Sequence, residues 1–391
     1  MAVYFEPIKT ALILFPIIAF LITLPYLIIE YHKYGAVSLL RSIIIYTFIL
    51  YLLVAFLLVI LPLPSTKTVL QMPTKLPQLV PFTFIKDIMV TTSINLKNPS
   101  TYLSFFKTPT VYTVIFNLLL LFPFGVYLHY YFEKKWYQVL IMSFCLSLFF
   151  EVTQLTGIFF IYPKAYRLFD VDDLLINTLG GILGFICTKP LTVFLPSRKE
   201  LDQKTYTKGT KISIYRRGIA LFIDLFLVFC FSTPIWILFG NKISFGILYS
   251  IILFLYEVSF PLLDNGKTIG KRLVNIRLNV INESDCFPIR LIFRQMLLYL
   301  FILRIPNYLS YLSKIHLENN GLEFLMIFGK LLMISYYLYF IYELFLNILG
   351  RRKNFNYERI SSVINYSLIV LQDDKNMIEQ IIGRNENENR S

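Results

Sequence analysis

Charged residues are scarce in this chain of 391 residues, and histidine and cysteine are scarcer still. Only 16% of the residues are charged and 56% are apolar, whereas a soluble domain has about 25% charged and about 45–50% apolar residues. The three histidines are scattered, which argues against a histidine-based zinc site. The four cysteines form no CxxC pair, and Cys145, Cys187 and Cys230 lie within apolar runs, so we expect buried thiols. We therefore expect no metal and no cofactor.

Positive charge exceeds negative charge, with 37 Lys and Arg against 24 Asp and Glu and a net charge of +13. A basic excess can indicate nucleic-acid binding. Basic residues of membrane proteins, however, gather in cytoplasmic loops and beside anionic lipids. We therefore expect membrane lipids as partners and no nucleic acid.

Apolar runs of about 20 residues, the length needed to cross a hydrocarbon core, recur along the chain. The first run is longer than the apolar region of a signal peptide and no small-residue cleavage site follows it, so we interpret it as a retained span. The sequence predicts an all-α, polytopic helical membrane protein with about nine transmembrane helices in two bundles. The predicted helices cover residues 9–30, 38–62, 110–131, 137–161, 173–195, 215–239, 244–263, 290–312 and 322–349.

A polar and basic segment separates the two bundles. We expect a first transmembrane domain at 1–196, a cytoplasmic linker at 197–211, a second transmembrane domain at 212–365 and a polar cytoplasmic tail at 366–391. Lys and Arg gather in the linker and after the seventh and ninth helices, and basic loops mark the cytoplasmic side. Nine spans then place the N-terminus outside and the C-terminus in the cytoplasm.

The loop 64–108 falls outside in this topology. Its proline-rich, partly apolar sequence suggests a short helix that lies against the membrane surface.

Glu151 is an acid inside the predicted helix 137–161, and Gln154 and Ser147 share its helix face. A charged residue in the middle of a membrane helix costs about 2.5–3.5 kcal/mol on insertion scales. A functional role is therefore favoured for Glu151. Gln154 fits equally well an interhelical hydrogen bond that only holds helices together.

The helix that begins near residue 173 carries a stripe of small and polar residues. Asp173, Asn177 and Gly181 recur every four residues, and Gly180 and Gly184 have the GxxxG spacing that lets a neighbouring helix approach closely. Asp173 and Asn177 are expected to face Glu151.

Acids at the start of this helix also suit the positive end of its dipole. Asp170 and Asp172 therefore fit simple caps as well as a site, whereas Asn177 lies too deep for capping. Because the polar positions of several helices fall at the same membrane face, we predict one outward-facing binding cluster. Its members are Asn117, Glu151, Gln154, Arg167, Asp170, Asp173 and Asn177.

The ordered pattern N…PFG, S…E..Q and R..D..D…N..GG..G resembles the VanZ-like family of bacterial membrane proteins over about residues 10–195. The matching residues are Asn117, Pro123, Gly125, Ser147, Glu151, Gln154, Arg167, Asp170, Asp173, Asn177, Gly180, Gly181 and Gly184. The family is named for a protein that gives low-level resistance to teicoplanin, a lipid-tailed glycopeptide antibiotic. The resemblance implies a cell-envelope role, with a lipoglycopeptide or a lipid-linked cell-wall precursor as partner. Abundant lysine, isoleucine and asparagine fit a Gram-positive bacterium.

In the second bundle, Arg217 begins a helix and Asp224 follows seven residues later on nearly the same face, which suggests a polar pair. The later string GKTIGKR lacks the GxxxxGK[ST] spacing of a phosphate loop. Alternating basic and apolar residues from Lys271 to Leu278 instead predict a basic, amphipathic surface segment on the inner leaflet.

These features resemble an RDD domain over about residues 213–365. Arg217 and Asp224 match the first arginine and aspartate of that family, and Glu358 stands where the family has a late aspartate. The resemblance implies a membrane domain that is associated with ion exchange in some members.

Three functions remain open from the sequence. The first is a non-enzymatic envelope protein that lowers susceptibility to teicoplanin-like antibiotics, and the second is an enzyme that modifies a membrane lipid or cell-wall precursor with Glu151 and Asp173 as acid and base. The third is a transporter in which Glu151 and Asp224 carry protons or ions. The sequence has no clear nucleophile–base pair and no inverted repeat of broken helices, so the first function is favoured.

Overall fold

The computed structural model describes residues 2–73, 76–92, 105–239, 244–282, 286–298 and 320–369. The chain divides into two compact units. Unit 1 comprises Met1–Thr23 and Ser38–Leu201, and unit 2 comprises Leu24–Val37 and Asp202–Ser391. Helix α1 (Ala2–Tyr34) therefore contributes its first part to unit 1 and its last part to unit 2, a division that the sequence does not suggest.

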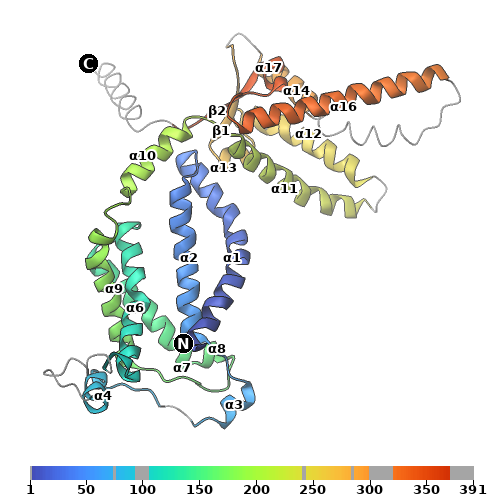
Figure 1. The fold of residues 1–391 in the computed structure, drawn as a ribbon. Coiled ribbons are helices and arrows are strands. Elements are labelled where there is room, and N and C mark those ends of the chain that lie inside the picture. Colours follow the sequence, from blue (N-terminus) through green and yellow to red (C-terminus); the bar gives the residue numbers. More distant parts are fainter. Residues whose placement is uncertain are drawn as a thin grey trace, which may run out of the picture. The chain divides into compact units, whose positions relative to one another are not determined.

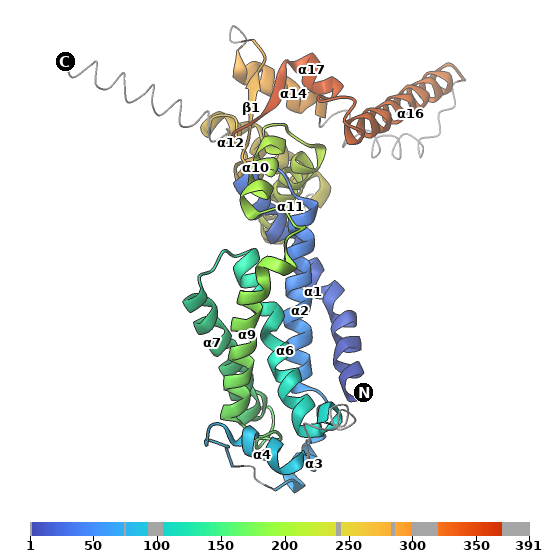
Figure 2. The ribbon, with the colours of Figure 1, turned by 60° about the vertical axis from the view of Figure 1, so that its left-hand side comes forward.

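Unit 1 consists of long apolar helices with three short helices at one end (Figures 1 and 2). Besides the first part of α1, its long helices are α2 (Leu39–Ile60), α6 (Pro109–Tyr130), α7 (Trp136–Leu155) and α9 (Val171–Leu191). The short helices are α3 (Thr66–Gln71), α4 (Thr83–Thr91) and α8 (Gly157–Phe160). We call the end that carries these short helices the α4 end.

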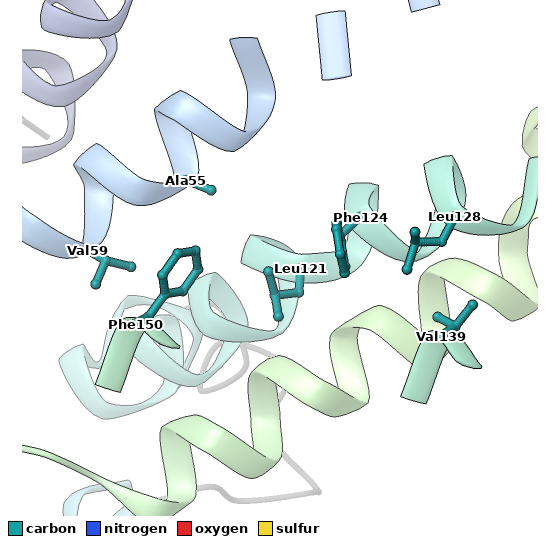
Figure 3. Packing of buried hydrophobic residues seen from close by; sticks show 7 residues of the cluster. All are labelled: Ala55, Val59, Leu121, Phe124, Leu128, Val139 and Phe150. Atoms are coloured by element: carbon teal, nitrogen blue, oxygen red, sulfur yellow. The ribbon is translucent and has the colours of Figure 1, made fainter. Parts of the chain in front are cut away.

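Helices α2, α6 and α7 share an apolar core in unit 1 (Figure 3). Leu121 at its centre is fully buried. Bulky aliphatic and aromatic side chains exclude lipid from this interior and fix the helix positions by packing. The buried members are Ala55, Val59, Leu121, Phe124, Leu128, Val139 and Phe150.

Helices α6 and α9 approach so closely that only glycine fits between them. A Cβ atom on Gly180 would lie 2.0 Å from the carbonyl oxygen of Leu118, and one on Gly184 would lie 2.0 Å from that of Phe122. The close approach that the GxxxG spacing predicts is therefore made to α6. It brings the starts of these two helices together at the α4 end.

Unit 2 combines long apolar helices with short helices and a pair of strands. Its pair of strands is antiparallel, with Ile276 opposite Ser367 and Val280 opposite Val363. Along the first strand Ile276 and Leu278 are buried, while Arg277 is exposed. The elements are α11 (Ile214–Leu238), α12 (Phe245–Leu263), α13 (Ile269–Leu273), β1 (Ile276–Val280), α14 (Phe287–Leu298), α16 (Asn320–Ile348), α17 (Asn356–Ser361) and β2 (Val363–Ser367).

Within the described residues, eight helices are long and apolar enough to cross a membrane. The predicted helix 290–312 is described only as far as Leu298, as α14, and its remainder lies outside the described residues. The predicted tail is described only to residue 369. In the predicted linker, the helix α10 (Arg198–Gly209) forms.

One expectation about single segments is wrong and another is only partly met. Cys145 and Cys230 are exposed and Cys187 is only partly buried, because an apolar run does not distinguish the lipid-facing side of a helix from its core. The basic, amphipathic segment from Lys271 to Leu278 forms the end of α13 and then β1; Arg272 and Arg277 are exposed as expected, but Lys271 is only 8% exposed.

The predicted helix 137–161 ends earlier than expected, at Leu155. Ile158, Phe159 and Phe160 then have positive φ angles of 59°, 51° and 68°. Left-handed residues cannot continue a right-handed helix. The turn leaves Phe160, which the prediction placed inside the span, 83% exposed at the α4 end.

Candidate functional site

A cavity of about 790 Å³ lies in unit 1 at the α4 end. Its polar wall contains six of the seven residues of the predicted cluster, from α6, α7, α9 and the segment before α9: Asn117, Glu151, Gln154, Arg167, Asp173 and Asn177. Lys107 and Thr113 add two further polar side chains. The remaining wall is apolar and consists of Ile8, Leu58, Val59, Phe106, Tyr112, Phe116, Leu120 and Phe150.

Asn117 and Asn177 tie α9 to two different neighbours. The amide of Asn117 on α6 donates to the carboxylate of Asp173. The amide nitrogen of Asn177 donates to Ser147 Oγ on α7 at 3.1 Å. The expectation that Asp173 and Asn177 face Glu151 is therefore modified, because their direct partners are Asn117 and Ser147.

Glu151 is 3% exposed, although it carries a carboxyl group. Its Oε2 accepts the backbone N–H of Asp170 at 3.0 Å. This contact fixes the segment before α9 against α7. The carboxyl group therefore helps to shape the cavity as well as to line it.

Gln154 and Arg167 bond to backbone carbonyl groups at the C-terminal end of α2, the first within the helix and the second at its C-cap. Gln154 Nε2 donates to the oxygen of Val59 at 3.1 Å, and Arg167 Nη2 donates to that of Leu61 at 2.6 Å. The last carbonyl groups of a helix have no partner within the helix. These bonds supply one, so the two side chains hold α2 in place at the cavity.

Asp170 is the member of the predicted cluster that does not line the cavity. It is the N-cap of α9, and its Oδ1 accepts the backbone N–H of Asp172 at 2.8 Å. Burial raises the pKa of the Asp170 carboxyl above its ordinary value. The sequence left open whether this residue is a helix cap, and its contacts show that it caps α9.

Asp172 has a role that the sequence did not reveal. It does not cap its own helix but binds the start of α4, accepting from Thr83 Oγ1 at 2.6 Å and from the backbone N–H of Phe84 at 2.9 Å. Gln78 pairs with the backbone around Asp170 as a single parallel bridge. Gln78, Thr83 and Phe84, which lie between α2 and α6, are therefore held at the start of α9 by contacts that are remote in sequence.

In unit 2 the three predicted polar residues do not form one group. Arg217 Nη1 pairs with Glu358 Oε2 at 2.9 Å and not with Asp224, which corrects the expected pair. Asp224 accepts hydrogen bonds from Tyr256 at 2.6 Å, from Thr268 at 2.6 Å and from the backbone N–H of Gly270 at 2.8 Å. The carboxylate thus anchors the start of α13.

The sequence did not indicate several ion pairs of unit 2 in which the acid is buried. Lys271 Nζ lies 3.3 Å from Glu257 Oε2, and Arg294 Nη2 lies 3.5 Å from Glu358 Oε1. Arg352 and Arg359 both lie 3.0 Å from Glu343 Oε1. Glu257 and Glu343 fall inside predicted spans, so the rule that singled out Glu151 would also have found them.

Arg216 is fully buried and donates to the carbonyl oxygens of Val274 at 2.7 Å, Gly209 at 2.9 Å and Asn275 at 2.8 Å. A guanidinium group offers five donors in a fixed plane, which suits such a set of acceptors. The sequence pointed to its neighbour Arg217 because periodicity alone does not tell which of two adjacent arginines is inside.

Within the described part of the chain, no group of three or more His, Cys, Asp or Glu side chains is placed to hold a metal ion. The long apolar helices, with polar groups inside their bundles, define a multi-pass, all-α membrane protein.

The family comparisons divide this membrane protein into two domains. The VanZ/LLP1 family matches residues 48–195, and the RDD family matches residues 212–355. The chain therefore joins a VanZ-like domain to an RDD domain, as the motifs predicted. No curated protein and no solved structure matches the chain.

Proposed function

We propose that the VanZ-like domain binds an amphiphilic molecule in the cavity at its α4 end and thereby lowers susceptibility to teicoplanin-class antibiotics. The observation that carries this proposal is one cavity with two kinds of wall. Glu151, Asp173 and Arg167 lie on the polar part, while Ile8, Leu58 and Phe116 belong to the apolar part.

The size and lining of the cavity support an amphiphile. Binding sites for small molecules have volumes of about 300–1,000 Å³ and combine apolar walls with a few placed polar groups. Ile8 and Phe116 of the apolar wall are 40% and 48% exposed, so this wall continues to the helix surface that faces lipid. A molecule with a polar head and an acyl tail fits both parts.

The charge distribution supports an outward-facing cavity. Basic residues gather after α9, in Arg198, Lys199, Lys204, Lys208 and Lys211, and such segments stay on the cytoplasmic side. The cavity lies at the other end of α9, beside Asp173. It therefore faces outward in this topology, where a cell-wall precursor or a lipid-tailed antibiotic meets the membrane of a Gram-positive bacterium.

Expression of the full chain in a susceptible Gram-positive strain tests this function. We expect the minimum inhibitory concentration of teicoplanin to rise by several twofold steps, because the antibiotic's target surface or its membrane-bound fraction changes. A glycopeptide without an acyl tail is the comparison, and we expect little change for it. Equal susceptibility with and without the protein, at verified membrane expression, contradicts the proposal.

A second candidate is an enzyme that modifies a membrane lipid or lipid-linked precursor. It is favoured by one observation, that Glu151 and Asp173 line the same cavity, since a pair of carboxyl groups can act as general acid and base. Mass spectrometry of lipids after incubation with the purified protein tests it. A new lipid product that disappears with Glu151→Gln supports catalysis, and unchanged lipids support binding alone.

A further inference from the structure

Three oxygen atoms on the polar wall of the cavity, one each on Glu151, Asp173 and Asn177, accept no hydrogen bond from the described residues. Asn177 is 3% exposed, and its Oδ1 atom is buried without a hydrogen-bond partner. Glu151 uses Oε2 for the backbone of Asp170, and Asp173 uses Oδ1 for Asn117. Among the described residues, no donor reaches the second carboxylate oxygen of Glu151 or of Asp173.

The charges of these carboxyl groups are also unpaired. No Lys or Arg of the described residues lies within 4 Å of the carboxylate of Glu151 or Asp173 in an ion pair. Arg167 directs its Nη2 to the carbonyl oxygen of Leu61, and Lys107 is exposed. A buried carboxylate without a cation is costly, because desolvation is not offset by attraction to a partner.

A bound group that supplies donors to these oxygens and a cation to these carboxylates must donate several hydrogen bonds and carry positive charge. A primary ammonium group does both, since it offers three N–H donors and one positive charge. We infer that the cavity takes an amphiphile whose head carries a primary ammonium group, held by Glu151, Asp173 and Asn177. This inference rests on the proposed function, because it names the class of ligand for the same site.

The rest of the wall fits the remainder of such a molecule. The apolar side chains of Leu58, Phe116 and Leu120 line the cavity beside the polar wall and suit an acyl chain. Arg167 lies on the polar wall as well and has donors left for an acidic group of the same head. An amine-bearing lipid and a lipid-tailed antibiotic with a free amine share this chemistry.

The test uses the full chain, purified in a non-ionic detergent, and three lysolipids with the same acyl chain. Lysophosphatidylethanolamine has a primary ammonium, lysophosphatidylcholine has the same charge without N–H donors, and lysophosphatidylglycerol has no cation. Binding is measured by the rise of the melting temperature, since a ligand of the folded state stabilises it. We expect the ethanolamine lipid to bind about tenfold more tightly than the choline lipid, a difference of about 1.4 kcal/mol. We expect the glycerol lipid to bind most weakly.

Two variants test which residues cause the preference for the ethanolamine lipid, and a third variant is the control. Glu151→Gln and Asp173→Asn should each remove most of the preference for the ethanolamine lipid. Glu133→Gln changes an exposed acid of unit 1 outside the cavity lining and should leave it intact. Equal binding of the three lipids, or tighter binding of the glycerol lipid, overturns the inference on the wild-type protein alone. A variant that does not fold therefore leaves the test decisive.

Competition then distinguishes the two sources of the amine. Teicoplanin that displaces the ethanolamine lipid only while its own amine is unblocked identifies the antibiotic as a ligand. Displacement by amine-bearing lipids alone identifies a lipid. The result can be told apart from that of the resistance test. Resistance in cells without selectivity for the amine in vitro contradicts only the inferred class of ligand. Selectivity for the amine in vitro without resistance in cells contradicts only the proposed resistance.

Discussion

In unit 1 the buried carboxyl group of Glu151 lies on the wall of a cavity, whereas in unit 2 that of Glu358 lies between two arginines. Glu151 has one backbone donor and no ion pair among the described residues. Glu358 accepts from Arg217 at 2.9 Å, from Asn365 at 2.6 Å and from the backbone N–H of Phe355 at 3.0 Å. Both side chains are almost completely buried, so burial alone does not separate them.

The difference teaches how to read a buried acid in a membrane protein. A carboxylate whose acceptors are filled by its own chain holds segments together, as Glu358 holds α17 to α11 and α14. A carboxylate with an empty acceptor on a cavity wall has capacity for a ligand. The number of partners, more than the depth of burial, distinguishes a structural charge from a binding site.

The largest effect on stability should come from removing Glu358, the carboxyl group that pairs with two arginines in unit 2. Glu358→Ala leaves Arg217 and Arg294 without their carboxylate, and removing one partner of a buried ion pair costs about 3–5 kcal/mol. We expect this loss in the free energy of unfolding, measured in detergent. A loss below about 1 kcal/mol, the range of surface ion pairs, would contradict the role of Glu358 as a structural charge.

A smaller effect on stability should come from disturbing the close packing of α9 against α6. In Gly180→Ala the added Cβ would lie 2.0 Å from the carbonyl oxygen of Leu118, so α6 and α9 must separate. Overpacking of this kind costs about 1–3 kcal/mol. Gly218→Ala on α11 is the matched control, because nothing lies within 4 Å of its Cβ position. Equal melting temperatures of the two variants would rule out the close helix contact.

The hydrogen bonds that hold the start of α4 should contribute less to stability than the packing of α6 against α9. Asp172→Ala removes the acceptor for Thr83 and Phe84, and loss of a helix cap costs about 0.5–2 kcal/mol. We expect faster proteolysis within residues 76–92 while the long helices stay folded. Asp87→Ala removes an exposed acid on α4 and serves as the control. Equal cleavage rates would show that Asp172 does not hold this segment.

The smallest effect on stability should come from Glu151→Gln, which keeps a hydrogen-bond acceptor for the backbone of Asp170 and removes an unpaired charge. We expect a change within about 0.5 kcal/mol, or a gain. A measured loss as large as that for Glu358→Ala would mean that both acids are structural and that the comparison fails.

The sequence was sufficient for features that depend on local composition. Long apolar runs predicted the spans, since length and apolarity decide whether a helix fits a bilayer. The cost of polar groups in lipid pointed to Glu151 and Asn177, and the glycine spacing pointed to the close contact of α9. These residues line or surround one cavity because their positions along the helices place them at the same end.

Features that depend on remote contacts could not be predicted. Asp172 binds α4, from which α6, α7 and α8 separate it along the chain, and β1 pairs with a strand that follows another membrane helix. The identical neighbours Arg216 and Arg217 differ only in what the fold places around them. Lys271 looked like a surface charge because its partner Glu257 lies on the preceding helix α12.

The most direct test of the central claim is the teicoplanin susceptibility of cells that carry Glu151→Gln in place of the wild-type chain. Membrane protein levels are matched, and Glu133→Gln is the control. The account predicts that Glu151→Gln reaches normal levels but loses most of the protection, while Glu133→Gln keeps it. Full protection by Glu151→Gln would contradict a binding role for this carboxyl group and therefore the proposed function of the cavity.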